Sequence, residues 1–352
     1  MTAVLDERNA VRRVASVRRR GIRRGRTVGL VLAALASGLV LLELSLGSVT
    51  LPPDDVLAAL FGTATPQAEY IVGEVRAPRA LTGALAGAAF GLSGAIFQGL
   101  VRNPLASPDI IGITMGASAA AVVAIVVFGA TGAPVSVSAF CGALGTATLI
   151  YVLAWRRGMS GYRLVLVGIA VAAVLSSVVS YLMTRAQVRD AQQALVWLTG
   201  SLTARTWTDV APLAVAVVVL VPPAVLLASG LRPLQFGDDA ATGLGVRVER
   251  HRLGLIVVAV ALAAAATAAA GPVAFVAFVS APIARALVNG NGPALVPAAF
   301  TGAVVLVGSD LVAQHVLELV GIVALPVGVV TGVLGAPYLL WLMSTTNRTG
   351  RA

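Results

Sequence analysis

The sequence predicts an all-α membrane protein with about ten transmembrane helices, and three observations support this fold class. Of the 352 residues, 58% are hydrophobic and only 11% are charged, whereas about a quarter of the residues in a soluble chain are charged. The mean hydropathy is +0.93, so too few polar side chains remain to cover a surface that faces water. The apolar residues also gather in runs of about 20, which is the length that a helix needs to cross the bilayer core.

Ten runs of apolar residues are candidate spans. They cover residues 27–48, 80–100, 110–129, 135–155, 164–184, 209–229, 253–270, 272–288, 294–314 and 324–343. The eighth is the weakest, because it is short and contains Pro282 and Arg285. We therefore expect three parts: an Arg-rich cytoplasmic segment (1–26), a transmembrane domain (27–343) and a cytoplasmic tail (344–352).

The placement of positive charge predicts the topology. The net charge is +10, and nine arginines precede the first span. Because positive residues stay on the cytoplasmic side, both termini of a ten-span chain lie in the cytoplasm. Twenty of the 25 basic residues then fall inside, and five fall outside: Arg76, Arg79, Arg185, Arg189 and Arg205. This pattern predicts a multi-pass protein of the cytoplasmic membrane and no nucleic-acid partner.

The N-terminal arginines have two interpretations. They can act as a determinant of topology, or they can bind anionic lipid at the membrane surface. The first interpretation is the simpler one, and it accounts for their position directly before the first span.

No residue pattern in the chain is typical of an active site or a metal site. All 25 basic residues are arginine, so the lysine that a P-loop places on nucleotide phosphates is missing. His251 and His315 each lack a second His, Cys or paired carboxylate at ligand spacing. We therefore expect no catalytic residue, metal or cofactor in this chain. If ATP powers transport, another polypeptide hydrolyses it.

A Gly-rich stretch at residues 76–116 is the most informative part of the chain. Gly83, Gly87, Gly91 and Gly94 recur at helical offsets, and small residues at this spacing let helix backbones approach closely in lipid. A sharp polar turn at 102–108 separates this helix from the next span. We expect this loop to move or to contact a partner.

The two halves of the chain show weak internal similarity, which favours an inverted repeat. Spans two to five and seven to ten would form two four-helix units of opposite orientation, an arrangement common in transporters. Between spans, residues 230–252 should hold a short cytoplasmic helix over Ala240–Leu244, capped at Gly237-Asp238-Asp239. Residues 49–75 and 185–206 should form short surface helices on the outer side.

Polar residues and prolines inside the spans leave several alternatives open. Gln98 either bonds a neighbouring helix or faces the pathway. Asp310 and Glu318 flank the outer end of the ninth span, where water would hydrate them, so no acid is evident at mid-membrane for a proton relay. The prolines in Gly271-Pro272, Ala281-Pro282 and Gly335-Ala336-Pro337 should break or kink helices near the pathway.

Several motifs in order resemble one known family. The stretch from Arg76 to Ala117 reads R-x-P-R, a Gly-rich span, F-Q-x-x-x-R-N-P-L-A-x-P and G-x-x-x-G-A. Three further segments agree: 271–276 (GPVAFV), 283–285 (IAR) and 325–338, which begins LPVGVVT and ends GAPY. Together they resemble the permease subunits of importers for iron–siderophores, haem and cobalamin.

The resemblance implies the fold of a type II ABC importer permease with inverted repeats. It also implies the partners: a second permease subunit (identical or homologous), two ATP-binding subunits and an extracytoplasmic substrate-binding protein. The wording of the last spans is closest to ferric-siderophore permeases, so ferric siderophore is the expected cargo, with haem or cobalamin as alternatives. An ion-coupled secondary transporter and a membrane scaffold without transport are the rival classes.

The resemblance also implies roles for individual residues. Arg76 and Arg79 would receive acidic residues of the binding protein, with simple interfacial anchoring as the alternative. Asn103 and Leu105, with Gly161 and Tyr162, would line the cytoplasmic gate. The residues expected to couple the permease to the ATPase are Gly237, Asp238, Asp239, Ala240, Ala241, Leu244 and Gly245.

Two departures from the family pattern concern the last spans. In the eighth span the expected proline is shifted by one position to give Ala281-Pro282, with no His or Gln beside it. In the ninth span, Gln314 stands where many relatives carry Arg, which removes one candidate docking charge.

Overall fold

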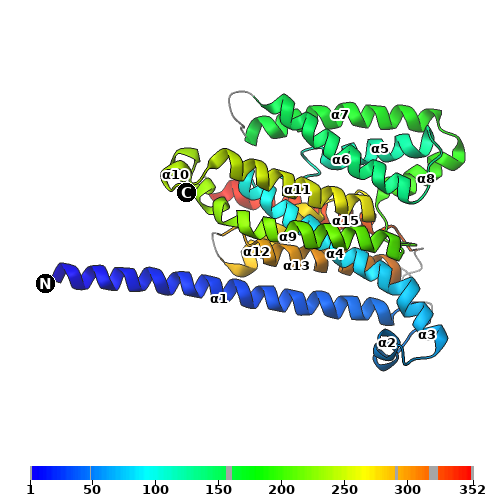
Figure 1. Cartoon of the computed structure of the whole chain (residues 1–352), viewed down its shortest axis with the longest axis horizontal. Helices are drawn as coiled ribbons and strands as arrows, with labels where there is room; N and C mark the ends of the chain where they lie inside the picture. Colours follow the sequence, from blue (N-terminus) through cyan, green and yellow to red (C-terminus); the bar gives the residue numbers. More distant parts are fainter. Residues whose placement is uncertain (1, 48, 156–160, 290–291, 317–323, 350–352) are drawn as a thin grey trace.

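The computed structural model describes residues 2–47, 49–155, 161–289, 292–316 and 324–349, and none of these residues lies in a strand. The elements in chain order are α1 (Thr2–Ser45), α2 (Pro53–Leu60), α3 (Pro66–Tyr70), η1 (Ile71–Arg76), α4 (Ala77–Val101), α5 (Ile113–Val126), α6 (Ala133–Ala154), α7 (Gly161–Arg185), α8 (Val188–Thr199), α9 (Trp207–Gln235), α10 (Asp238–Gly243), α11 (Val248–Ala270), α12 (Val276–Val288), α13 (Leu295–Leu311), η2 (Val312–Val316) and α15 (Val327–Thr349). Figure 1 shows the long helices lying side by side in one bundle.

The predicted fold class is confirmed. Within the described ranges, eight helices are long and apolar enough to cross a membrane, and α5 and α12 are shorter apolar helices. Together they match the ten predicted spans one for one. The second predicted span is longer than expected, because α3 and η1 continue into α4 and the segment Pro66–Val101 is unbroken.

The two short helices begin later than their sequences predict. The third predicted span starts at 110, but α5 starts at Ile113, after Gly112 with a φ of +89°. The eighth starts at 272, but α12 starts at Val276, after Phe275 with a φ of +67°. A residue in the left-handed region cannot belong to an α-helix. Each helix therefore begins only after this residue and is shorter than its apolar run predicts.

The ends of the bundle divide the loops into two groups. Figure 1 shows α10, the start of α1 and the end of α15 at one end, and α2, α3 and α8 at the other. The short helices predicted in 49–75 and 185–206 are therefore present and share one end. α1 is one continuous helix that runs through the expected boundary between 26 and 27, and its first half extends beyond the bundle (Figure 1).

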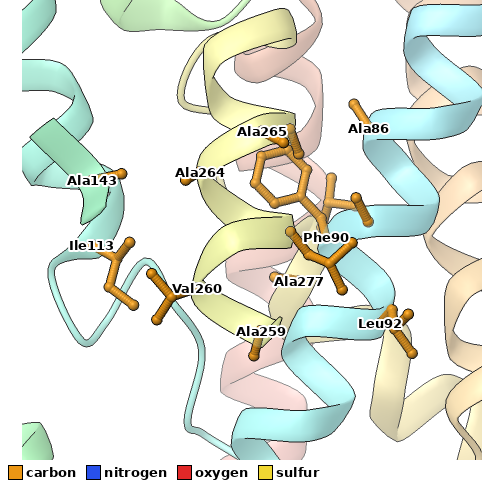
Figure 2. Packing of buried hydrophobic residues seen from close by; sticks show 14 of the residues in the cluster. Ala86, Phe90, Leu92, Ile113, Ala143, Ala259, Val260, Ala264, Ala265 and Ala277 are labelled. Atoms are coloured by element: carbon orange, nitrogen blue, oxygen red, sulfur yellow. The ribbon is translucent and has the colours of Figure 1, made fainter. Parts of the chain in front are cut away.

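The core is built around α4. Its glycines have no side chains, so neighbouring helices can approach its backbone closely. A Cβ on Gly87 would overlap the carbonyl oxygen of Gly302 in α13, and a Cβ on Gly94 would overlap that of Ala277 in α12. On another face of α4, Phe90 is fully buried and points toward Ala265 of α11 (Figure 2). The glycine stripe therefore sets the backbone-to-backbone contacts that its spacing predicts.

The contacts between helices repeat in the two halves. The helices α4, α5, α6 and α7 of the first unit correspond in order to α11, α12, α13 and α15 of the second. Within each unit the second helix packs on the third and on the fourth, and the first helix of each unit packs on the third helix of the other. The first helices of the two units meet directly, since the Ser93 hydroxyl donates to the Ala259 carbonyl oxygen at 2.7 Å. The described helices thus form the two related four-helix units that the sequence predicts.

Candidate functional site

A polar cavity of about 500 Å³ opens at the end of the bundle that carries α2, α3 and α8. Its lining comes from the end of α1, η1 with the start of α4, the loop after α8, and η2. The polar residues among them are Glu43, Glu74, Arg76, Arg79, Thr203, Arg205, Thr206, Gln314 and His315. The two arginines of the R-x-P-R motif therefore share one cavity. Their docking role stays a prediction.

Arg76 is buried and closes the end of α1. Its guanidinium donates to the carbonyl oxygens of Leu44 at 2.8 Å and Ser45 at 3.2 Å, and also to that of Val49. The last carbonyl groups of a helix have no partner within the helix, and a cation is favourable there because of the helix dipole. Arg76 thus anchors α1 to η1, and its bonded oxygens carry no formal charge.

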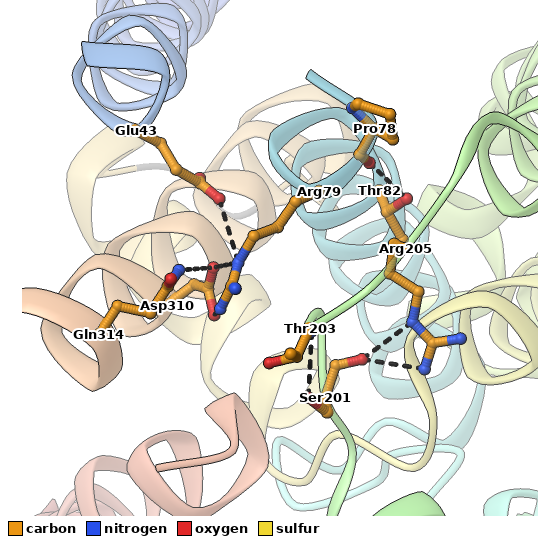
Figure 3. A network of polar contacts seen from close by, with 9 residues as sticks. All are labelled: Glu43, Pro78, Arg79, Thr82, Ser201, Thr203, Arg205, Asp310 and Gln314. Carbon is orange, nitrogen blue, oxygen red and sulfur yellow. Dashed lines mark hydrogen bonds and ion pairs between the residues drawn. The ribbon is translucent and has the colours of Figure 1, made fainter. Parts of the chain in front are cut away.

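Arg79 is held by two acids from other helices. Its Nε and Nη2 donate to the two carboxylate oxygens of Asp310 in α13 at 2.7 and 2.9 Å. Its Nε also lies 3.7 Å from Glu43 Oε1 in α1 (Figure 3). Both carboxylates are buried, Asp310 at 0% and Glu43 at 3% exposure. Arg79 therefore joins three helices within the chain.

The expectation that water hydrates Asp310 is wrong. The guanidinium of Arg79 and the side-chain amide of Gln314, which donates at 2.9 Å, replace water around this carboxylate. Burying a carboxylate is costly unless it is paired with a cation and hydrogen-bonded. Asp310 has an ion pair with Arg79 and a hydrogen bond from Gln314. Gln314, which stands where the family pattern has Arg, thus bonds within its own chain. Glu318 lies outside the described residues.

Glu43 is a site residue that the sequence interpretation missed. It lies in the predicted span 27–48, and both of its carboxylate oxygens are buried without a hydrogen-bond partner in the part of the chain that the structure describes. The signal was available, because an isolated acid inside an apolar run marks a functional candidate by default.

Arg205 forms the opposite wall of the cavity. Its Nε and Nη2 donate to the Ser201 carbonyl oxygen at 3.1 and 2.9 Å (Figure 3). Its Nη1 lies 3.7 Å from Asp209 Oδ1. Burial lowers the pKa of the Arg205 guanidinium, and the charge of Asp209 opposes this shift. The loop itself is fixed by the Ser201 amide, which donates to the Ala270 carbonyl oxygen at 3.0 Å.

At the other end of the bundle, α4 stops at the predicted polar turn. Arg102 adopts a φ of +57°, and the Asn103 Oδ1 accepts a hydrogen bond from the Leu105 amide at 2.9 Å. This side-chain turn replaces the next helical bond. Gly161 begins α7 directly against the end of α4, since a Cβ there would lie 3.2 Å from Val101 Cα. The four predicted gate residues therefore come from two neighbouring segments, and Tyr162 is 78% exposed.

The two short helices identify the region where a pathway can form. α5 and α12 occupy corresponding positions in the two units, and interrupted spans at matching positions of a repeat are typical of a substrate pathway. The loop before α5 enters the bundle, since a Cβ on Gly168 of α7 would overlap the Ile111 carbonyl oxygen. Within it, Asp109 Oδ1 accepts from the Thr114 hydroxyl at 2.6 Å.

Other predicted polar and proline positions have structural partners. Gln98 Nε2 donates to the Phe278 carbonyl oxygen at 2.9 Å, and its Oε1 accepts from Arg285 at 2.6 Å, so Gln98 joins α4 to α12. Pro282 and Pro337 lie inside helices that continue through them. The helices are therefore not broken at these two prolines, whereas the break predicted at Gly271-Pro272 is confirmed, since α11 ends at Ala270 and α12 begins at Val276.

The predicted coupling segment forms a separate short helix. α10 begins at Asp238 rather than at Ala240, because Gly237 with a φ of +109° turns the chain after α9. Arg252 of α11 donates to Asp238 Oδ1 at 2.7 Å, and Ala241 is buried. Most of α10 is exposed at the same end of the bundle as the start of α1 (Figure 1).

Within the described residues, no group of three His, Cys, Asp or Glu could hold a metal ion.

Comparison with known proteins gives one consistent result. Residues 32–345 match the FecCD transport family. The chain is 43% identical over 302 residues to the ferric enterobactin transport system permease protein FepG of Escherichia coli (strain K12), covering 86% of this chain and 91% of that protein. It is 36% identical over 330 residues to the probable siderophore transport system permease protein YfhA of Bacillus subtilis (strain 168), covering 92% and 95%.

The fold is also similar to that of a solved structure. A metal-chelate type ABC transporter in an inward-facing conformation superposes with a TM-score of 0.78 and 26% sequence identity. The match covers 91% of this chain and 99% of that chain. The likeness therefore extends over almost the whole helical bundle.

Proposed function

This chain belongs to the FecCD transport family, and we propose that it carries ferric siderophores across the cytoplasmic membrane as the permease subunit of an ATP-driven importer. It is a multi-pass membrane permease of the ABC importer type. The observation that carries the cargo assignment is the 43% identity over 86% of the chain to a permease named for ferric enterobactin.

ATP hydrolysis is assigned to a separate subunit that binds α10. The chain has no lysine for a P-loop. α10 is a short exposed helix fixed to α11 by the 2.7 Å contact between Asp238 and Arg252. A short helix anchored at one edge can enter a cleft of a partner and pass its movement to α11.

A second permease subunit is assigned to the faces of α7 and α15. These are the last helices of the two units, and only 17% and 22% of their apolar windows are buried within the chain. Large apolar side chains on both are exposed, among them Leu166 and Leu334. A second subunit against these helices would enclose a pathway between two copies, and Asn103 and Tyr162 would lie at its cytoplasmic end.

The outer cavity is assigned to docking of an extracytoplasmic binding protein. Asp310 and Glu43 offset the charge of Arg79, whereas no carboxylate of the described ranges lies within 4.0 Å of the Arg76 guanidinium. Arg76 therefore supplies the charge that would attract a carboxylate of the partner. Binding outside and ATP-driven closure inside then bias two arrangements of the helices.

Uptake into proteoliposomes tests the proposal. The permease is reconstituted with its ATPase and binding protein, and iron-loaded siderophore is supplied outside. We expect uptake that requires ATP inside and survives an ionophore that collapses ion gradients. Uptake that needs no ATPase and follows an ion gradient would establish the secondary transporter instead.

Docking is tested with Arg76→Gln, which removes the charge but keeps an amide that can donate to the carbonyl oxygens of α1. We expect weaker affinity for the binding protein and a smaller dependence of that affinity on salt. Arg189→Gln in α8, also an outer arginine, is the matched control. Unchanged affinity in a folded Arg76→Gln permease would reject docking at this residue.

A further inference from the structure

A second large cavity, of about 840 Å³, lies between α1, α9 and the start of α13. Its lining comes from these three segments, so α1 and α9 form its two sides and the start of α13 lies between them. Its walls are largely apolar, with Gly25 and Ala33 from α1, Ala228 from α9, and Val296 and Phe300 from α13. α7, one of the two helices assigned to the second permease, lies across the bundle from α1 (Figure 1).

Two arginines line the same cavity. Arg26 lies in α1 directly before its apolar part, and Arg232 lies in the last turn of α9. Both are exposed, and the described lining of this cavity contains no carboxylate. Ser229, one turn before Arg232, adds a hydroxyl group to the rim. The groove is therefore cationic at the end of the bundle that carries α10, and apolar toward the membrane interior.

We propose that this groove binds one anionic phospholipid of the cytoplasmic leaflet. Arg26 and Arg232 hold the phosphate, since guanidinium groups bind phosphate oxygens through charge-assisted hydrogen bonds. An acyl chain packs along the small residues of α1 and the larger apolar residues of α13. Basic pockets between transmembrane helices on the cytoplasmic side bind anionic headgroups for the same reason.

The combination of charge and apolar wall selects a lipid as the occupant. A free phosphate would use the two arginines but leave the apolar groove empty. A zwitterionic lipid would fill the groove, but its own ammonium group offsets its phosphate, so it would not neutralise the two arginines. The lipid also has a structural consequence, because α1 is only 28% buried over its apolar window. A bound lipid would connect α1 to α9 across the groove.

Native mass spectrometry of the full-length permease in detergent tests the charge requirement. Dioleoylphosphatidylglycerol and dioleoylphosphatidylcholine are titrated against the wild type and against Arg26→Gln with Arg232→Gln. We expect the wild type to prefer phosphatidylglycerol by about tenfold and the double variant to lose that preference. Arg19→Gln with Arg20→Gln is the control, because it also removes two positive charges from the chain but changes no residue of the cavity lining. Equal loss in both double variants would overturn the site.

A second pair of variants tests the acyl groove without changing charge. Ala33 lines the cavity, whereas Ala34 is exposed next to it and does not. We expect Ala33→Leu to weaken phosphatidylglycerol binding several-fold and Ala34→Leu to leave it unchanged. Inorganic phosphate at millimolar concentration should not displace the lipid. Displacement by phosphate, or equal binding by both leucine variants, would show that the site is not a lipid groove. ATP-driven uptake is measured in parallel, so a failure here is distinct from a failure of the transport proposal.

Discussion

The guanidinium of Arg79 and the carboxylate of Asp310 form two parallel hydrogen bonds, of 2.7 and 2.9 Å, between residues 231 positions apart in the chain. Glu43 approaches the same guanidinium at 3.7 Å. Two buried carboxyl groups thus share one arginine, and α1, α4 and α13 meet at this point. A carboxylate of a docking protein would have to compete with Asp310 for Arg79, which is why we place the attraction at Arg76.

Removing Arg79 should destabilise the protein more than removing the charge of Asp310. Arg79→Met leaves two buried carboxyl groups without a counterion, and breaking a buried pair in this way costs about 3–5 kcal/mol. Asp310→Asn leaves Arg79 with Glu43 and should cost less. Thermal unfolding in detergent measures both, with the exposed Arg189→Met as control. Equal losses for Arg79→Met and Asp310→Asn would contradict this assignment of roles.

Gly302→Ala should disrupt the packing of α4 on α13. A Cβ at this position would overlap the carbonyl oxygen of Gly87, and a backbone cannot move aside as a flexible side chain can. Overpacking of this kind costs about 1–3 kcal/mol. The matched control is Gly145→Ala in α6, where a Cβ would meet nothing within 4 Å. The yield and melting temperature of the purified protein should fall for Gly302→Ala only.

Gly237→Ala should uncouple α10 from the ATPase while leaving the membrane domain folded. Gly237 has a φ of +109°, which an alanine adopts only with strain. Gly243 lies at the other end of α10 without this constraint, and a Cβ there would meet nothing within 4 Å. Co-purification of the ATPase should therefore decrease for Gly237→Ala and persist for Gly243→Ala. Normal co-purification of the ATPase with both variants would show that α10 does not couple the permease to the ATPase.

Asn103→Ala should loosen the turn that follows the last residue of α4. The substitution removes the oxygen that accepts from the Leu105 amide, whereas Asn103→Asp keeps it. Loss of one such bond costs about 1 kcal/mol. If this turn belongs to the gate, Asn103→Ala proteoliposomes should leak siderophore without ATP, and Asn103→Asp should not. An equal and low leak in both would place the gate elsewhere.

The sequence predicts the bundle well, because lipid imposes a strong constraint on each helix separately. Length and hydropathy identify every span, and the spacing of Gly87 and Gly94 identifies the close contacts of α4. The helix starts at Ile113 and Val276 are less predictable, since they depend on left-handed residues whose conformation is set by packing from distant segments. Of the two short helices, only the eighth span is recognised as a weaker one from the sequence, and the third is not distinguished from the long spans.

The cavity that contains Arg76 and Arg79 is the part that the sequence predicts least. Its residues come from segments as far apart as Glu43 and Gln314, and no local pattern indicates that Asp310 meets Arg79. The predicted topology places the two arginines on the outer side, but neither that prediction nor the family pattern reveals their intramolecular partners. Hydrogen bonds between distant helices are a property of the packed bundle, so they follow only from three-dimensional geometry.

The unbroken course of α4 from Ala77 to Val101 has a mechanical consequence. Over its 25 residues the helix spans about 37 Å, with Arg79 in its first turn and Asn103 just beyond its last. It is one continuous helix whose two ends lie at opposite ends of the bundle. If the helix tilts as one body about the close contact of Gly91 with the Ala298 carbonyl group, its Arg79 end and its Asn103 end move in opposite directions. A movement at the Arg79 end can thus reach the Asn103 turn through the helix itself, without a chain of side-chain contacts between the two.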